Sequence, residues 1–176
     1  MAMDSGPGEQ TRQVIATDLP IPTTRLLAFL DEIGLSWEFA ELDDNTFVPG
    51  LCILQGRLLV DATRLKYPGD ILHEAGHLAV TSAAERPTLG PGGLEDPGFE
   101  MAALAWSYAA SVHLGLPPEL VFHPAGYKGN SDWLIHTYQS GGTLGQPMLA
   151  WLGLTSWGSQ GGGTAYFPAM ARWVRE

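Results

Sequence analysis

The feature that most constrains this chain is a glutamate and two histidines inside an apolar run, in the segment His73-Glu74-Ala75-Gly76-His77. Residues four apart lie on one face of a helix, so both imidazoles can reach one metal ion. Such polar groups are costly in a buried helix unless each finds a partner. The alternative is an ordinary pair of hydrogen-bonded core histidines with the glutamate at the surface. The flanking residues are apolar and predict a buried helix: Ile71, Leu72, Leu78, Ala79 and Val80.

Glu74 follows the first histidine directly and lies near enough to the same helical face to contact a water on the metal. Zinc lowers the pKa of such a water to about 7, and a carboxylate beside it can take the proton. We therefore expect Zn²⁺ as cofactor, with His73 and His77 as ligands and Glu74 as general base. Asp70 is the expected N-cap of this helix. Gly76 between the ligands costs helix stability and indicates that another backbone or a substrate comes close.

A catalytic zinc usually takes three protein ligands and leaves one position open. The leading candidate for the third ligand is Glu100, which begins a second apolar helix 23 residues after His77. Its neighbours are apolar, so we expect a half-buried carboxylate that needs a partner. Glu95 and Asp96 are rivals on the preceding loop. A helix N-cap explains Asp96, and an exposed loop acid is the simpler interpretation of Glu95.

With these residues the chain resembles the gluzincin branch of zinc metallopeptidases, and within it the small ImmA/IrrE-like proteins. The resemblance covers about residues 50–114. It implies a zincin-like fold, zinc bound by His73, His77 and Glu100, Glu74 as general base, and hydrolysis of a peptide bond. The similar features are a short strand, the HExxH helix and a helix of the form E-x-x-A-x-x-aromatic, at residues 57–61, 73–77 and 100–106.

The oxyanion formed during peptide hydrolysis needs a hydrogen-bond donor besides the metal. The loop at residues 122–130 is the best source, because its glycines let the backbone approach closely. We expect Tyr127 as this donor in preference to His123. A phenol stays protonated at neutral pH, and the proline after His123 restricts that residue to extended conformations. The alternative is that Tyr127 is a surface aromatic and that His123 caps a turn.

Short strand-like runs between residues 36 and 61 predict a small antiparallel sheet, with turns at 43–45 and 55–56. We expect an α+β, zincin-like fold in which this sheet packs on the HExxH helix and the glutamate-bearing helix crosses behind. Residues 1–13 are polar and small and are expected to be disordered. Residues 14–176 are expected to form one zincin-like domain, with an irregular, Gly-rich C-terminal third.

The charge balance excludes several classes of partner. The chain has 9 Lys and Arg against 19 Asp and Glu, a formal net charge of −10. Such a surface repels phosphate backbones and anionic lipid, so we expect neither a nucleic-acid nor a membrane partner. No apolar run approaches the roughly 18 residues of a membrane span, and no secretory signal is evident, so we expect a cytoplasmic protein. The one cysteine, Cys52, excludes a disulfide framework and is expected to be a small core residue on a strand.

Two functions compete for this site. The first is zinc-dependent hydrolysis of a peptide or protein substrate by a metal-activated water, with Glu74 as general base. The second is a non-catalytic zinc-binding or regulatory module that binds a peptide on the same fold. Glu74 separates the two, because a structural site needs no base beside its ligands. We favour the enzyme, and the oligomeric state stays open.

Overall fold

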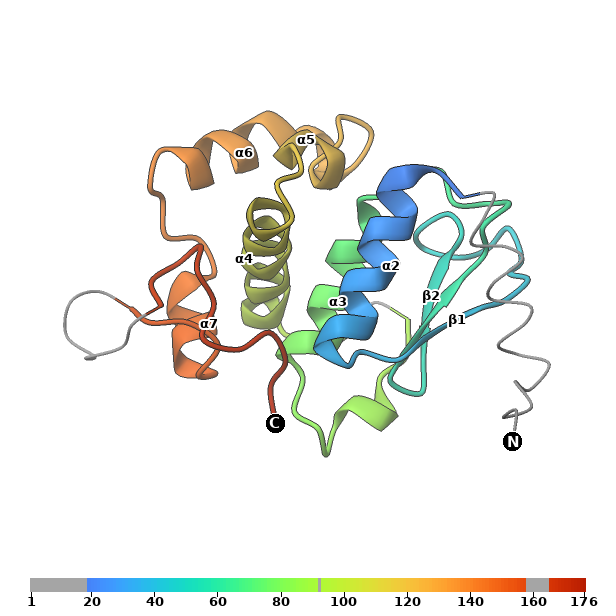
Figure 1. Ribbon diagram of the computed structural model, residues 1–176, viewed down its shortest axis with the longest axis horizontal. Coiled ribbons are helices and arrows are strands. Elements are labelled where there is room, and N and C mark those ends of the chain that lie inside the picture. The colour runs from blue at the N-terminus through green and yellow to red at the C-terminus, as the bar shows by residue number, and fades with distance from the viewer. Residues whose placement is uncertain (1–18, 92, 158–164) are drawn as a thin grey trace, which may run out of the picture.

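The computed structural model describes residues 19–91, 93–157 and 165–176. The expectation of disorder at residues 1–13 lies outside this part of the chain. The described part is a mixture of α-helices and one small sheet (Figure 1), which confirms the α+β class. Its elements are α2 (Ile21–Ile33), β1 (Trp37–Phe39), β2 (Leu51–Leu54), β3 (Arg57–Val60), α3 (Asp70–Val80), α4 (Pro97–His113), α5 (Pro118–Val121), α6 (Ser131–Gln139) and α7 (Gln146–Trp151), with short 3₁₀ helices η1 (Arg86–Thr88) and η2 (Tyr127–Gly129).

The sheet is mixed, so the expectation of an antiparallel sheet was wrong. Its strand order is β1-β3-β2, with β2 antiparallel to β3 and β1 parallel to it. The turn at residues 55–56 joins β2 to β3 as expected. Residues 40–50 form no hairpin and instead cross the end of β3. There the Asp61 carboxylate accepts from the Leu42 N–H (3.0 Å), and the Asp61 N–H donates to the Gly50 carbonyl (2.9 Å). This crossing connection lets β1 run parallel to β3.

Helix α3 lies at the centre of the fold, between the sheet and α4 (Figure 1). It contacts β2, β3 and α2 on one side and packs along α4 on the other. Helix α2 turns one face to this core, where Leu26 and Leu30, four residues apart, are fully buried. It ends at Gly34, which has φ 78° and donates its N–H to the last turn, as a left-handed C-terminal residue does.

Helices α3 and α4 approach each other very closely. A Cβ atom at Gly76 would lie only 2.9 Å from the Ala103 carbonyl oxygen and 3.2 Å from the Ala103 Cα. Only glycine leaves room for such an approach, as its place between the histidines indicated. Small side chains on α4 allow the same closeness, since Ala102, Ala103 and Ala105 are fully buried. The contact brings the first turn of α4 beside the histidines of α3.

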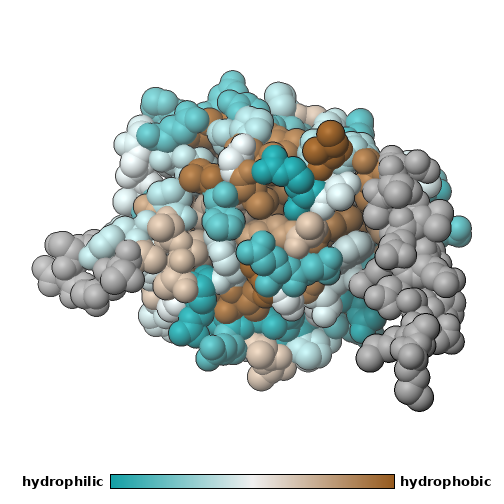
Figure 2. All heavy atoms as spheres, in the orientation of Figure 1, coloured by the Kyte–Doolittle hydropathy of each residue, from teal (hydrophilic) through white to brown (hydrophobic). Residues whose placement is uncertain are grey.

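The described C-terminal residues, 165–176, pack against helices α2, α3 and α4. The Trp106 indole N–H of α4 donates to the Trp173 carbonyl (2.8 Å), and the Arg175 N–H donates to the Ala79 carbonyl at the end of α3 (2.9 Å). The Trp173 ring packs edge-on against Phe29 (5.1 Å between centroids). On the face shown in Figure 2, polar residues surround smaller apolar areas. No described helix has the length and apolar character needed to cross a membrane.

Candidate metal centre

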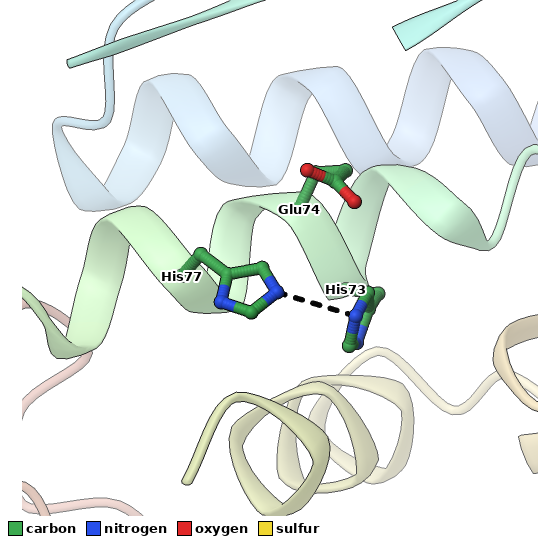
Figure 3. Close-up of side chains that lie close together, drawn as sticks. All are labelled: His73, Glu74 and His77. Carbon is green, nitrogen blue, oxygen red and sulfur yellow. Dashed lines mark hydrogen bonds between the residues drawn. The ribbon is translucent and has the colours of Figure 1, made fainter. Parts of the chain in front are cut away.

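The two histidines of α3 lie on the side of the helix that faces α4, with their rings turned toward one another (Figure 3). The Nε2 atoms of His73 and His77 are 3.3 Å apart, and the rings are nearly perpendicular at 80°. Two nitrogens that each bind zinc at 2.0–2.1 Å in tetrahedral geometry are separated by about 3.4 Å. The pair therefore has the spacing that one metal ion requires.

Glu100 reaches the same place from α4. Its two carboxylate oxygens lie 3.5 Å from the His73 Nε2 and 3.3 Å from the His77 Nε2. The start of α4 is fixed by Asp96, which accepts a hydrogen bond from the Gly98 N–H (2.7 Å) and so is the expected N-cap. This cap puts Glu100 in the first helical turn, with a side chain that is 48% exposed. Of the three acidic candidates, Glu100 is the one beside the histidines, and Glu95 lies exposed on the loop.

Glu74 is the second carboxylate at the histidines. It is only 5% exposed, and its ligand atom lies within 4.8 Å of those of both His73 and His77, so this group can hold a metal ion. In Figure 3 its carboxylate lies on a different side of α3 from the two rings. Burial raises the pKa of Glu74 to about 8, and the negative charges of Asp70 and Glu100 add to the shift. A nearby cation would reverse that shift and favour the carboxylate.

Both imidazoles are held neutral. Burial lowers the pKa of His73 to about 3, with a further contribution from His77, and burial lowers the pKa of His77 to about 4. A neutral imidazole keeps a ring nitrogen lone pair for a metal. The Nδ1 atoms of both rings are buried without a hydrogen-bond partner in the described structure. Such orphaned nitrogens are rare in a protein interior.

A search of protein-family models, of curated proteins and of solved structures found no match to this chain. The zincin-like resemblance therefore rests on the residues quoted for it. The function has to be argued from the geometry of the site.

Tyr127 lies against the first histidine. Its ring meets the His73 ring edge-on, 5.7 Å between centroids, and its hydroxyl is buried without a hydrogen-bond partner. Burial raises the pKa of Tyr127 well above its usual range, and nearby carboxylates reinforce the shift, so the phenol stays protonated. The residue begins η2 with φ 56°. A left-handed conformation at an aromatic residue costs on the order of 1–3 kcal/mol, and such conformations cluster at functional sites.

The His123 ring lies near the Tyr127 ring and is held by the carboxylate of Asp70. Its Nε2 is 2.9 Å from the Asp70 carboxylate, and its ring stacks on Tyr67 at 3.8 Å. Asp70 is therefore not the N-cap of α3; the cap position is Gly69, and no side chain caps the helix. Burial raises the pKa of Asp70, while the hydrogen bond from His123 opposes that shift. Because its Nε2 is committed to Asp70, His123 holds the start of α3.

Sequence reasoning missed two residues at this centre and assigned a third to the wrong role. Tyr67 stacks on His123. The only sequence signal that could have placed Tyr67 at this centre was its position just before α3. Gly93 lies against the second histidine: a Cβ atom there would be 2.7 Å from the His77 Nδ1. Its φ of 68° favours glycine independently. Asp70 was noticed but assigned to a cap, because its partner is 53 residues away.

Proposed function

We propose that this chain is a zinc-dependent peptide hydrolase with a zincin-like site, in which His73, His77 and Glu100 hold the metal. The observation that carries the proposal is the set of separations between the three side chains, 3.3 to 3.5 Å. They agree with the roughly 3.4 Å between ligands of a tetrahedral zinc. Neutral imidazoles and a half-exposed carboxylate also suit a metal that keeps one position open.

The two carboxylates at the histidines take different roles in this proposal. Glu100 presents one oxygen to each Nε2 and is assigned as ligand. Glu74 is buried beside the histidines, and a nearby cation favours its carboxylate form, which suits a group that accepts a proton and then passes it on. Zinc, when bound, supplies a Lewis acid that lowers the pKa of a water to about 7. Glu74 then receives the proton of the attacking water and delivers it to the leaving amine.

Tyr127 and His123 complete the assignment. The buried hydroxyl of Tyr127 has no partner in the described structure, so it is free to donate to the oxyanion of a bound peptide. His123 is a positioning residue: its bond to Asp70 holds the first turn of α3, and its ring lies 6.0 Å from that of Tyr127. Both residues therefore support the same reacting centre from the loop that follows α5.

The proposal is tested by comparing the full chain with its Glu74→Gln variant after each has been loaded with zinc. We expect both proteins to bind about one zinc and only the unaltered chain to hydrolyse a mixed peptide library. Equal hydrolysis by the variant would remove Glu74 from the mechanism. Zinc binding without hydrolysis in the unaltered chain would leave the non-catalytic module as the function of this site.

A further inference from the structure

The last turn of α3, the helix that carries both histidines, is bound by residues from outside the helix. The last four carbonyls of any helix have no partner within it and need donors from elsewhere when they are buried. Leu78 and Ala79 are fully buried. The Thr81 hydroxyl donates to the His77 carbonyl (2.8 Å), and two arginines, Arg86 and Arg175, supply the donors for the next two carbonyls.

Arg86 brings a guanidinium to this end of α3. Its Nε donates to the Leu78 carbonyl (2.9 Å). Its Nη2 donates to the Thr81 carbonyl (2.9 Å) and to the Arg175 carbonyl (2.6 Å). A positive charge at the C-terminus of a helix is favourable, and the planar guanidinium serves several acceptors at once, as the ammonium of lysine does not. Arg86 therefore binds the end of α3 and the C-terminal residues together.

The backbone of Arg86 is itself fixed. Its N–H donates to the Ser82 carbonyl (2.8 Å). Its carbonyl lies against the turn between β2 and β3, where a Cβ atom at Gly56 would collide with it. Gly56 also has φ 75°, a conformation that favours glycine. The guanidinium therefore reaches α3 from a backbone that is packed against the sheet.

Residues 173–175 connect this end of α3 to α4. The Arg175 N–H donates to the Ala79 carbonyl (2.9 Å), and the Trp173 carbonyl accepts from the Trp106 indole N–H (2.8 Å). The rings of Trp173 and Trp106 meet edge-on at 5.6 Å between centroids. In Figure 1 the red C-terminal segment ends near the last turn of α3. One short backbone segment thus binds a residue of each helix.

These contacts lie close to the proposed metal ligands. Ala79 follows His77 by two residues, about 3 Å along the axis of α3. Trp106 follows Glu100 by six residues, about 9 Å along the axis of α4. The 3.3 Å between His77 Nε2 and the Glu100 carboxylate depends on how the two helices lie against each other. Because metal–ligand distances tolerate only about 0.2 Å, a small shift at residues 173–175 is enough to disturb this separation.

We infer that the Arg86 side chain and residues 173–175 form a clasp, which holds α3 against α4 and so sets the affinity of the metal centre. Arg86 is a positioning residue in this inference. The inference rests on the metal centre of the proposed function, without depending on hydrolysis, and adds a way to regulate that centre. Release of residues 173–175 weakens metal binding. Coupling between two sites is reciprocal, so metal binding in turn stabilises the clasp.

Two variants of the full chain break the clasp at different points. Arg86→Lys keeps the charge and loses the planar guanidinium, and Arg175→Pro removes the N–H that binds the Ala79 carbonyl. The matched controls are Arg57→Lys, at an exposed arginine of β3, and Arg175→Ala, which keeps the N–H. Zinc affinity is measured by competition with a chelator, well below the melting temperature of each protein. We expect about tenfold or weaker zinc binding in both clasp variants, as after loss of an outer partner of a metal ligand, and unchanged binding in both controls.

The unaltered chain provides a second test that needs no variant. Hydrogen exchange of the Arg175 amide and the Trp106 indole N–H is followed by NMR with and without zinc. We expect zinc to slow both by about the factor seen in the titrations, because the coupling is reciprocal. The Asp61 N–H, which binds the Gly50 carbonyl beside β3, is the control and should respond less. An equal change at all three groups, or no change at the clasp, contradicts the coupling.

The outcomes separate the clasp from the proposed function. Unchanged zinc affinity in a folded clasp variant, with only a lower melting temperature, overturns the clasp and leaves the metal centre in place. Weaker zinc binding in both clasp variants supports the clasp even if the chain hydrolyses no peptide. Failure of the unaltered chain to bind zinc contradicts the clasp and the proposed function together. Arg175→Pro lies one residue before the last of the sequence, so the test does not depend on Arg86→Lys folding correctly.

Discussion

The raised pKa of Glu74 predicts how the stability of the metal-free protein depends on pH. Its pKa is about 8 in the folded chain, against an ordinary value of 4.5. The folded state therefore holds this proton more tightly than the unfolded state does. The contribution of Glu74 to stability is fully present below pH 4.5 and is lost as the pH rises through about 8.

The magnitude follows from the size of the shift. One pKa unit corresponds to about 1.4 kcal/mol, so the whole window is worth about 5 kcal/mol. Between about pH 5.5 and about pH 7.5 the wild-type chain should lose about 2–3 kcal/mol relative to Glu74→Gln, which has no proton to lose. Comparing the two chains cancels the titration of groups common to both, including His73 and His77.

The assay is urea unfolding of both proteins in the presence of a chelator, at several pH values across this window. Glu95→Gln is the matched control, because it removes a glutamate from an exposed loop and should track the wild type at every pH. Saturating zinc should flatten the difference, since a nearby cation favours the carboxylate. Parallel stability curves for wild type and Glu74→Gln without metal would refute the argument that burial keeps this group protonated.

Three further predictions concern the metal and the reaction. The wild-type chain should take up about one zinc, and His73→Ala and His77→Ala should each abolish that uptake in metal analysis, because each removes a ligand. Glu100→Gln should weaken zinc binding in a competition titration by more than the roughly 10–100-fold that loss of an outer partner costs, while Glu95→Gln should not; a larger loss in the second variant would reverse the assignment. Tyr127→Phe should lower kcat by about 10²–10³-fold with little change in KM, as loss of an oxyanion donor does. Its free energy of unfolding should stay the same or rise, because the hydroxyl it removes is buried and unpaired; an unchanged kcat would exclude Tyr127 as the donor.

Features set by neighbouring residues were the ones that sequence reasoning predicted. Asp96 caps α4, and the turn at residues 55–56 joins β2 to β3. Each of these signals acts within a few residues, so the residue type alone carries it. The spacing of His73 and His77 is also local, because four residues along a helix return to the same face.

Sequence reasoning missed the features that depend on contacts between residues far apart in the sequence. The parallel pairing of β1 with β3 depends on a crossing connection held by Asp61, and turn residues within that connection favoured a hairpin instead. Asp70 resembled an N-cap because aspartate is common there, but its carboxylate binds His123. In each case the decisive contact joins residues far apart in the sequence. Hydrophobic periodicity and capping preferences carry no information about such contacts.

The glycines at this centre explain why the spacing of the three proposed metal ligands depends on more than the ligands themselves. At Gly76 a Cβ atom would collide with the backbone of Ala103, and at Gly93 it would collide with the ring of His77. A side chain at Gly76 would push α4 outward and carry Glu100 away from the histidines. One at Gly93 would turn the His77 ring. Because metal–ligand distances tolerate only about 0.2 Å, either shift would spoil a site whose ligands were all still present. The close approach of α3 to α4 therefore sets the position of Glu100, as the four-residue spacing along α3 sets the positions of His73 and His77.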